Sequence, residues 1–223
     1  MTGLPPAERE QPLRLRDGRS VAVRMVGPPD GVLVADLFGR LSMESMAMRF
    51  GSARRGLSPE EVTRMCAEPG AEGIGFVALA GAGGREFAVG LARRDRDAGA
   101  PEGEFSVAVD DAWQGLGVGT GLLERVVDGA AFLGLEGMWA GVRPGNVKML
   151  GVFRALGGEV REMAGYDEVL VRLPVQRDDD LEEAEARRFG RAAAASLLPM
   201  LRPRAIAVIG ASRDAARPGG AVL

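Results

Sequence analysis

The stretch from Phe105 to Leu123, FSVAVDDAWQGLGVGTGLL, constrains the fold more than any other part of this 223-residue chain. A short apolar run leads into a polar turn, and glycine then occupies positions 115, 117, 119 and 121 at the start of an apolar helix pattern. A strand, a glycine-lined turn and a helix N-terminus bring bare backbone N–H groups and the positive end of the helix dipole to one place. The segment therefore predicts a phosphate-binding turn.

The spacing within this turn excludes two common nucleotide motifs. A P-loop needs Gly-Lys-Ser/Thr, and the single lysine of the chain, Lys148, lies far downstream. A dinucleotide fingerprint needs a third glycine where this chain has Thr120 in one register and Leu122 in the other. The turn is therefore not expected to bind ATP, GTP or NAD in either of these ways.

The composition narrows the chemistry further. The chain has no histidine and one cysteine, which excludes Ser-His-Asp triads, Cys-His pairs and histidine-based metal sites, so we expect a carboxylate as any general base and no metal. The net charge is -3 and the basic residues form no cluster, so no nucleic-acid partner is expected. No apolar stretch is long enough to cross a membrane and the N-terminus lacks a signal-peptide core, which predicts a cytoplasmic location without membrane contact.

Apolar periodicity predicts a mixed α/β sheet with the glycine turn near its middle. We expect an opening hairpin around Asp17-Gly18, followed by two helices, one over Val32–Leu41 and one after the N-cap signal at Ser58-Pro59. The other expected elements are strands over 75–80, 86–92, 104–109, 138–142, 159–163 and 168–173, and helices over 117–133 and 147–156.

The character of the chain changes after Pro174. Residues 1–175 are expected to form one domain, and residues 176–203 an acidic and then arginine-rich linker helix. Residues 205–212, AIAVIGAS, have the pattern of a buried parallel strand that enters another glycine turn. A lone strand and helix cannot bury both faces, so we expect residues 204–223 to be the truncated start of a second, nucleotide-type domain.

The glycine turn matches a third pattern, Gln/Arg-x-x-Gly-x-Gly/Ala, with Gln114, Gly117 and Gly119. This pattern is similar to the pyrophosphate loop of the GNAT acetyltransferase superfamily, and the segment 146–158 resembles the second GNAT signature. Residues 41–50 and 57–62 resemble the first helical region of Pat-type protein acetyltransferases, in which a GNAT domain is fused to an NDP-forming acyl-CoA synthetase-like region. Residues 206–212 resemble the opening of the CoA-binding, Rossmann-like domain of that region.

The resemblance implies an α/β (α+β) GNAT fold, with a mixed, mostly antiparallel sheet that is splayed at a central bulge and flanked by helices. It also implies acetyl-CoA as cosubstrate, with pantetheine on the backbone of residues 105–109 and pyrophosphate on the glycine loop. The residues implied for CoA binding are Val107, Ala108, Val109, Gln114, Gly115, Leu116, Gly117, Val118, Gly119, Thr120, Asn146 and Phe153.

Glu104 is the expected general base, because it resembles in position the catalytic glutamate of Pat-type enzymes and partial burial would raise its pKa. The carboxylates of Glu102, Asp110 and Asp111 are less favoured. Phe153 stands where many GNAT members have a tyrosine that protonates the departing thiolate. Ordinary packing is the expected role of Tyr166 and Cys66, so no general acid is assigned.

The resemblance implies a protein Nε-lysine acetyltransferase that acts on metabolic acyl-CoA synthetases and is controlled by the synthetase-like region of the same full-length chain. Two alternatives stay open at this point. The chain could acetylate a small amine, because the loop concerns the donor and not the acceptor. It could also be a non-catalytic CoA-sensing domain, an alternative that the phenylalanine at position 153 keeps open while Glu104 favours an enzyme.

Overall fold

The computed structural model describes residues 10–70, 72–81, 85–95, 97, 100–133, 135–162, 168–175, 186, 190–195, 197 and 201–202. Most of the expected linker helix over 176–203 lies outside the described residues, and so do Tyr166 and the whole expected Rossmann-like segment over 204–223.

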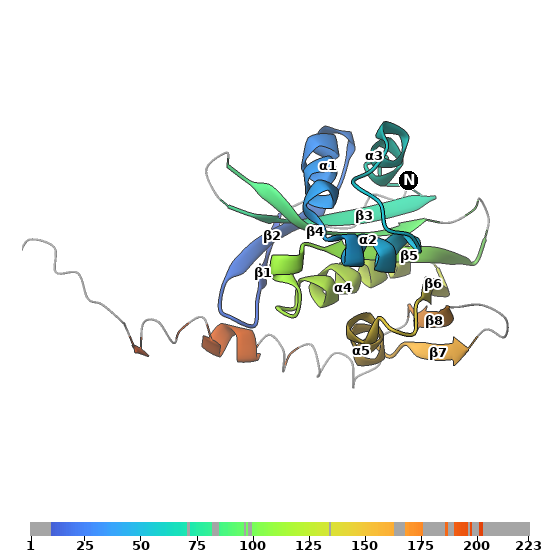
Figure 1. Ribbon diagram of the computed structural model, residues 1–223. Helices are drawn as coiled ribbons and strands as arrows, with labels where there is room; N and C mark the ends of the chain where they lie inside the picture. The colour runs from blue at the N-terminus through green and yellow to red at the C-terminus, as the bar shows by residue number, and fades with distance from the viewer. Residues whose placement is uncertain are drawn as a thin grey trace, which may run out of the picture.

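The described strands form one sheet in the order β1-β2-β3-β4-β5-β6-β8-β7 (Figure 1). β5 and β6 pair in parallel and every other neighbouring pair is antiparallel, which confirms the expected mixed, mostly antiparallel sheet. The strands are β1 (Gln11–Arg14), β2 (Ser20–Met25), β3 (Gly73–Ala80), β4 (Phe87–Asp95), β5 (Glu102–Val109), β6 (Gly137–Val142), β7 (Glu159–Glu162) and β8 (Val169–Pro174).

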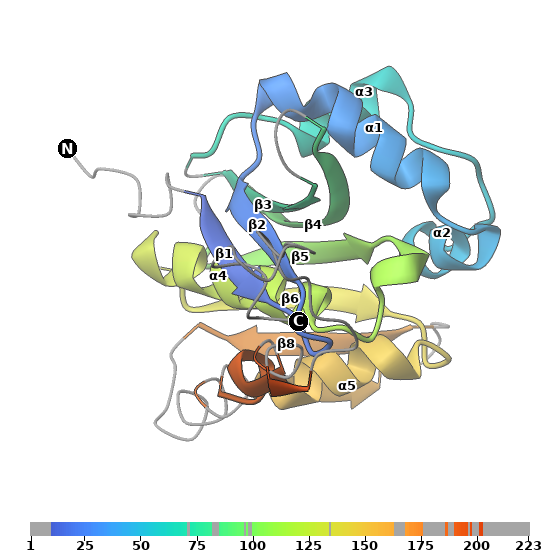
Figure 2. The ribbon, with the colours of Figure 1, turned by 90° about the vertical axis from the view of Figure 1, so that its left-hand side faces the viewer.

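Helices cover both faces of the sheet (Figure 2). α1 packs on β4 and on α3, whereas α4 packs on the opposite face against β3, β4 and β5, and α5 packs against β7. The helices are α1 (Gly31–Arg40), α2 (Met43–Phe50), α3 (Pro59–Met65), α4 (Val118–Phe132) and α5 (Val147–Ala155), with short 3-10 turns at η2 (Pro28–Asp30) and η3 (Asp111–Trp113).

The expectation of two helices between the first hairpin and β3 was wrong, because α2 is a third. Ser42 starts α2 by accepting the backbone N–H of Ser45, and Gly51, with φ +75°, ends it. Met46 is the one side chain of α2 that is buried. Met43, Met46, Ala47 and Phe50 nevertheless follow the i, i+3, i+4, i+7 spacing of an amphipathic helix, so the sequence does contain a helix pattern here, which the expected set of elements lacks.

Two hydrophobic cores lie on the two faces of the sheet, and β3 contributes to both. Ile74 and Phe76 point into the core under α4, while Val77 points into the core under α1. Because both faces are covered, β3 reads as a continuous apolar run. The β3–β4 register shifts between Ala78 and Leu79, which is a β-bulge beside the centre of the sheet.

The sheet opens between β5 and β6. Their parallel pairing covers three positions, ending at Glu104 opposite Trp139. Beyond that point β5 stays paired with β4 as far as Val109, and β6 stays paired with β8 as far as Val142. The two strands therefore diverge after Glu104, and the edge of β5 that faces β6 is left open.

Candidate active site

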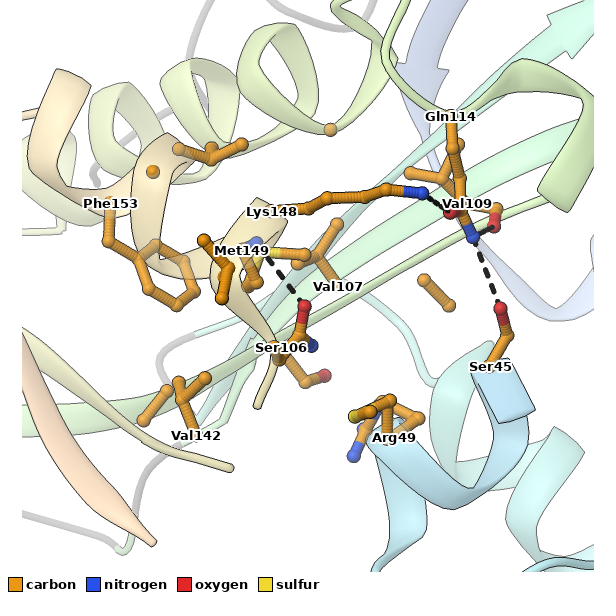
Figure 3. A pocket seen from close by; sticks show the side chains of 18 of the residues that line it. Ser45, Arg49, Ser106, Val107, Val109, Gln114, Val142, Lys148, Met149 and Phe153 are labelled. Carbon is orange, nitrogen blue, oxygen red and sulfur yellow. Dashed lines mark hydrogen bonds between the residues drawn. The ribbon is translucent and has the colours of Figure 1, made fainter. Parts of the chain in front are cut away.

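A pocket of about 1070 Å³ lies where β5 and β6 diverge, and α2 and α5 contribute side chains to its walls (Figure 3). We call residues 114–120 the loop end of the pocket, and Glu104, Arg49 and Trp139 the strand end. The predicted site residues that line the pocket are Glu104, Val107, Ala108, Val109, Gln114, Gly115, Gly117, Gly119, Thr120, Asn146 and Phe153.

Two of the predicted residues do not line the pocket. Val118 is buried in the core under α4, and Leu116 packs at the edge of the same core. The backbone carbonyl of Leu116 accepts the N–H of Arg16 at 3.0 Å. These two residues can therefore contact a ligand in the pocket only through their backbone groups.

The backbone of the loop end depends on two glycines. Gly115 has φ +74° and Gly117 has φ +100°, and L-residues with a side chain rarely adopt such angles. The first backbone hydrogen bond of α4 joins the N–H of Gly121 to the carbonyl of Gly117. The N–H groups of residues 118–120 therefore precede the hydrogen-bonded ladder, at the positive end of the helix dipole, which is a binding geometry for an anion.

The other two alternate glycines have different roles. A Cβ on Gly121 would lie 2.5 Å from Cδ1 of Leu13, so this glycine allows α4 to pack closely against β1. A Cβ on Gly119 would lie 3.5 Å from Cγ2 of Val109, which is ordinary contact. The glycine pattern, which the sequence presents as one unit, thus combines two conformational glycines with a packing glycine.

Gln114 braces the loop end through its side chain. Its Nε2 donates to Oγ of Ser45 at 3.1 Å and to the carbonyl of Val109 at 3.3 Å, and its Oε1 accepts from Nζ of Lys148 at 3.5 Å (Figure 3). These contacts join α2, the end of β5 and α5. Sequence reasoning placed Gln114 at the loop but did not foresee that its amide connects three elements.

Asp111 ties α2 to the loop end. Its carboxylate accepts the backbone N–H of Ser42 at 2.9 Å and the hydroxyls of Ser42 and Ser45 at 2.8 and 2.7 Å. Partial burial raises the pKa of Asp111, but the hydrogen bonds from Ser42 and Ser45 outweigh that effect and lower the pKa below its usual value. The carboxylate is therefore held ionised as a fixed acceptor.

Arg16 belongs to the site, although no pattern in the sequence pointed to it. It lies in the turn between β1 and β2, and its Nη1 donates to the carbonyl of Gly115 at 3.3 Å. Arg16 and Lys148 both line the pocket and contact residues of the loop, which places two cationic side chains at the loop end.

Glu104 lies at the strand end with an exposed side chain. The expected partial burial is therefore not observed. Among the residues that the structure describes, Glu104 has no ion pair or hydrogen bond from its carboxylate. Its backbone is the last position of β5 that pairs with β6.

The three less favoured carboxylates are all engaged elsewhere. Glu102 accepts from Nε of Arg172 at 2.7 Å, and Asp110 accepts from Nε of Arg40 at 3.0 Å. Asp111 is occupied by Ser42 and Ser45, as described above. The structure thus adds a physical distinction between Glu104 and these neighbours to the preference that the resemblance implied.

Arg49 is a second side chain that sequence reasoning missed. It is partly buried, lines the strand end, and its guanidinium carbon lies 4.8 Å from the ring centroid of Phe50. The spacing of four between Ser45 and Arg49 places both on one face of α2. That spacing could have indicated a shared surface, had α2 been recognised as a helix.

Asn146 and Phe153 come from α5 and its start. Oδ1 of Asn146 accepts the N–H of Met149 at 3.2 Å, so Asn146 is the N-cap of α5. Phe153 is buried against Phe105, with ring centroids 5.1 Å apart and planes at 83°. Cys66 is buried away from the pocket, and burial raises the pKa of its thiol.

Two kinds of feature are absent from the described part of the chain. No group of three or more His, Cys, Asp or Glu side chains there could hold a metal ion. No helix there is long and apolar enough to span a membrane.

Solved structures share this architecture. The GNAT domain of S. lividans PAT matches with a TM-score of 0.69 and 28% identity, over 76% of this chain and 98% of that one. The cAMP-binding acyltransferase from Mycobacterium smegmatis matches with a TM-score of 0.54 and 22% identity, over 84% of this chain and 56% of that one. The Salmonella typhimurium protein yncA, determined with its cofactor acetyl-CoA, matches with a TM-score of 0.55 and 19% identity, over 71% and 95%. The last two, at such low identity, support the fold alone.

The sequence itself matches a family model over residues 43–157, which include α2, the loop end and α5. That model is the acetyltransferase (GNAT) family, whose members use acetyl-CoA. The match spans more than half of the chain and agrees with the fold, the diverging strands and the glycine loop. This chain therefore belongs to the GNAT family of acetyltransferases.

Proposed function

We propose that this chain is an acetyl-CoA-dependent protein Nε-lysine acetyltransferase in which Glu104 is the general base. The observation that carries the proposal is the unpaired carboxylate of Glu104 at the point where β5 and β6 diverge and the pocket opens. The likeness to the GNAT domain of S. lividans PAT and the resemblance of residues 41–50 and 57–62 to Pat-type enzymes support a lysine of a protein as the acceptor.

The residues present fit acetyl-CoA as the donor. The free N–H groups of residues 118–120 suit its pyrophosphate, and the cations of Arg16 and Lys148 stand beside them. The open edge of β5 beyond Glu104 offers backbone groups to the amides of the pantetheine arm. The loop end thus binds the donor in this account, and the strand end receives the acceptor.

The reaction begins with proton transfer from the acceptor ammonium to Glu104. The neutral amine then attacks the carbonyl carbon of the thioester and a C–N bond forms. The C–S bond breaks, the CoA thiolate leaves, and the excess proton on the nitrogen passes to water, which gives the neutral amide. Alignment of both reactants supplies most of the acceleration. A docked acceptor protein would also cover the exposed Glu104 and exclude water from it.

The departing thiolate has no assigned acid. Phe153 lacks a hydroxyl, and it is held in the core by Phe105. Cys66 lies outside the pocket lining. The modest basicity of a thiolate allows it to leave without a proton, which agrees with this arrangement.

The resemblance to Pat-type enzymes extends the proposal beyond the described residues. Metabolic acyl-CoA synthetases are the proposed substrates, and a synthetase-like region that begins near residue 204 is the proposed regulatory partner. Cytoplasmic residence belongs to the same proposal.

A transfer assay with isotope-labelled acetyl-CoA tests the acceptor class. The purified chain is incubated with an acyl-CoA synthetase, or with a panel containing an aminoglycoside, a polyamine and free amino acids. We expect label on a lysine of the synthetase. Label on a small amine alone would identify a small-molecule acetyltransferase, and saturable acetyl-CoA binding without any transfer would identify a CoA sensor. Self-acetylation adds little background, since Lys148 is the single lysine and its ammonium is at the loop end.

A further inference from the structure

Arg49 is the cationic side chain at the strand end of the pocket. It stands on α2, one turn after the Ser45 that binds Gln114, and Figure 3 shows it on the far side of the pocket from Gln114 and Lys148. The other cations that line the pocket, Arg16 and Lys148, are at the loop end. Arg49 is therefore separated from the site proposed for the phosphates.

Arg49 differs from the arginines around it because it forms no salt bridge with a described residue. Arg54 packs on the same Phe50 ring, also at 4.8 Å, and forms a two-pronged ion pair with Glu61. Arg40 pairs with Asp110. Within the described part of the chain, no carboxylate lies within 4.0 Å of the Arg49 guanidinium.

The environment of Arg49 makes an anionic ligand favourable. Removal from water lowers the pKa of the Arg49 guanidinium. The negative charges of Glu104 and Asp95 raise this pKa, but by less. A cation that is partly desolvated and unpaired has lost hydration without gaining an ion pair. A ligand carboxylate can supply that pair at little further cost, because the guanidinium is already in place.

The acceptor is the ligand that can bring this carboxylate. From Glu104 to Val109, β5 rises by roughly 17 Å at about 3.4 Å per residue, which separates the strand end from the phosphates at the loop end. A lysine ammonium that approaches Glu104 also approaches the positive charge of Arg49 and is repelled by it. An anionic group next to that lysine would remove the repulsion.

We infer that Arg49 is a specificity-determining residue that binds a carboxylate of the acceptor, so that the chain selects a polypeptide lysine with a glutamate or aspartate beside it. The inference rests on the proposed function for the identity of the acceptor amine. Arginine suits this role better than lysine, because its planar guanidinium binds a carboxylate through two parallel hydrogen bonds.

Binding measurements test the inference without turnover. The probes are pairs of short peptides with one lysine. One peptide of each pair has glutamate at a position close to the lysine, on either side of it, and the other has glutamine at the same position. Each peptide is titrated by calorimetry into protein saturated with CoA. We expect glutamate at one position or more to tighten Kd on the order of 10-fold relative to glutamine. Arg49→Gln should abolish the preference, and Arg49→Lys should keep part of it.

The matched control is Arg55→Gln. Arg55 is exposed, lies outside the pocket lining and is close to α2, so its replacement removes the same charge from the same region. This variant should keep the full preference for glutamate. A preference that weakened equally in both variants would overturn the inference, because it would come from overall charge.

A transfer assay with the same peptides separates this inference from the proposed function. In the wild-type chain we expect the preference in KM, with kcat nearly unchanged. A glutamate preference in binding that depends on Arg49, without acetyl transfer, would refute the proposed function and support the role of Arg49. Equal binding of glutamate and glutamine peptides, a preference that survives Arg49→Gln, or Arg49-dependent binding of free lysine but of no peptide, would overturn the inference.

Discussion

The loop end and the strand end of the pocket differ in how far their side chains are already bonded to the protein. At the loop end Gln114 joins three elements, and beside it Asp111 accepts three hydrogen bonds from Ser42 and Ser45 at the start of α2. At the strand end, the charges of Glu104 and Arg49 act on each other, but among the residues that the structure describes neither side chain forms a salt bridge within 4.0 Å or a charged hydrogen bond. Side chains at the loop end are thus already bonded within the protein, whereas the charged side chains at the strand end are not.

This difference matches the ligands proposed for the two ends. The CoA part of the donor is the same in every turnover, so a braced and preorganised loop lowers the cost of ordering it on binding. The acceptor must be recognised and its amine deprotonated. Charges left without a protein partner are available for both tasks, and satisfied charges such as that of Glu102 are not.

The largest expected effect is on catalysis at the strand end. Glu104→Gln removes the proposed base but keeps the size of the side chain, and we expect kcat/KM for a protein lysine to fall roughly 100-fold. Residual turnover should persist, because alignment of the reactants is retained. Steady-state kinetics with the acyl-CoA synthetase measure the change.

Glu102→Gln is the matched control on the same strand. Glu102 is bonded to Arg172 and lies outside the pocket lining, so kcat/KM should change less than about 2-fold, as expected for a surface ion pair. Equal losses in the two variants would show that the effect of Glu104 comes from the strand and not from a base.

At the loop end the expected effect is on donor binding. Gly117→Val places a branched side chain at φ +100°, which costs about 1–3 kcal/mol in the observed conformation and favours another path for the loop. We expect the Kd for acetyl-CoA to rise on the order of 10-fold. Gly39→Ala, on α1 with open space around it and an ordinary φ, should bind acetyl-CoA as the wild type does. Unaltered binding by Gly117→Val would mean that the loop only packs.

The hydrogen bonds that Asp111 accepts at the start of α2 should contribute to the thermal stability of the chain. Asp111→Ala removes three hydrogen bonds to Ser42 and Ser45 near the surface, so we expect Tm to fall by about 2–4 °C, with no comparable loss in Asp36→Ala, whose exposed carboxylate has no such bonds. The pKa of Asp111 is lower in the folded chain than its reference value of 3.8. The stabilisation is therefore complete above pH 3.8 and is lost as the pH falls through the lower folded value. A Tm difference between wild type and variant that persists unchanged in strong acid would contradict this account.

The smallest effect is expected away from both ends, in α3. Glu61 caps α3 by accepting the N–H of Ser58 and pairs with Arg54, and these contacts, the pair with Arg54 first, lower its pKa to about 2. Its contribution should be complete above its reference value of 4.5 and be lost as the pH falls through about 2. Because the pair is near the surface, Glu61→Gln should lower Tm by only about 1–2 °C at neutral pH, measured by thermal melting. A larger loss in Glu61→Gln than in Asp111→Ala would reverse the expected order of the two variants.

Local pattern was enough to predict most of the fold and the loop end. The helix expected over 117–133 is observed at Val118–Phe132, and the strand expected over 104–109 is observed at Glu102–Val109. Apolar periodicity and glycine spacing indicate both, because the buried side chains of α4 face one core and those of β5 face the cores on the two sides of the sheet. The expected set of elements lacks α2, although Met43, Met46, Ala47 and Phe50 have helical spacing, because eight residues are shorter than the window over which that signal is read.

The bracing contacts and the unpaired charges could not be predicted in the same way. Arg16 and Gly115 are 99 positions apart in the sequence, and Gln114 and Ser45 are 69 apart. One sequence contains no signal for such a pairing, which arises when the sheet brings the β1–β2 turn and α2 to the loop. The resemblance favours Glu104 over Glu102 by position alone, and the structure adds the physical reason by placing Arg172 beside Glu102.

The central claim is that donor binding and acceptor activation are divided between the two ends of one pocket. The most direct test is the Kd of acetyl-CoA for the Glu104→Gln variant, measured by calorimetry. We expect a Kd within about 2-fold of the wild-type value, because the phosphates and pantetheine are bound at the loop end and along β5. Acetyl-CoA binding weakened by about 10-fold or more would contradict the division and assign Glu104 to the donor site instead.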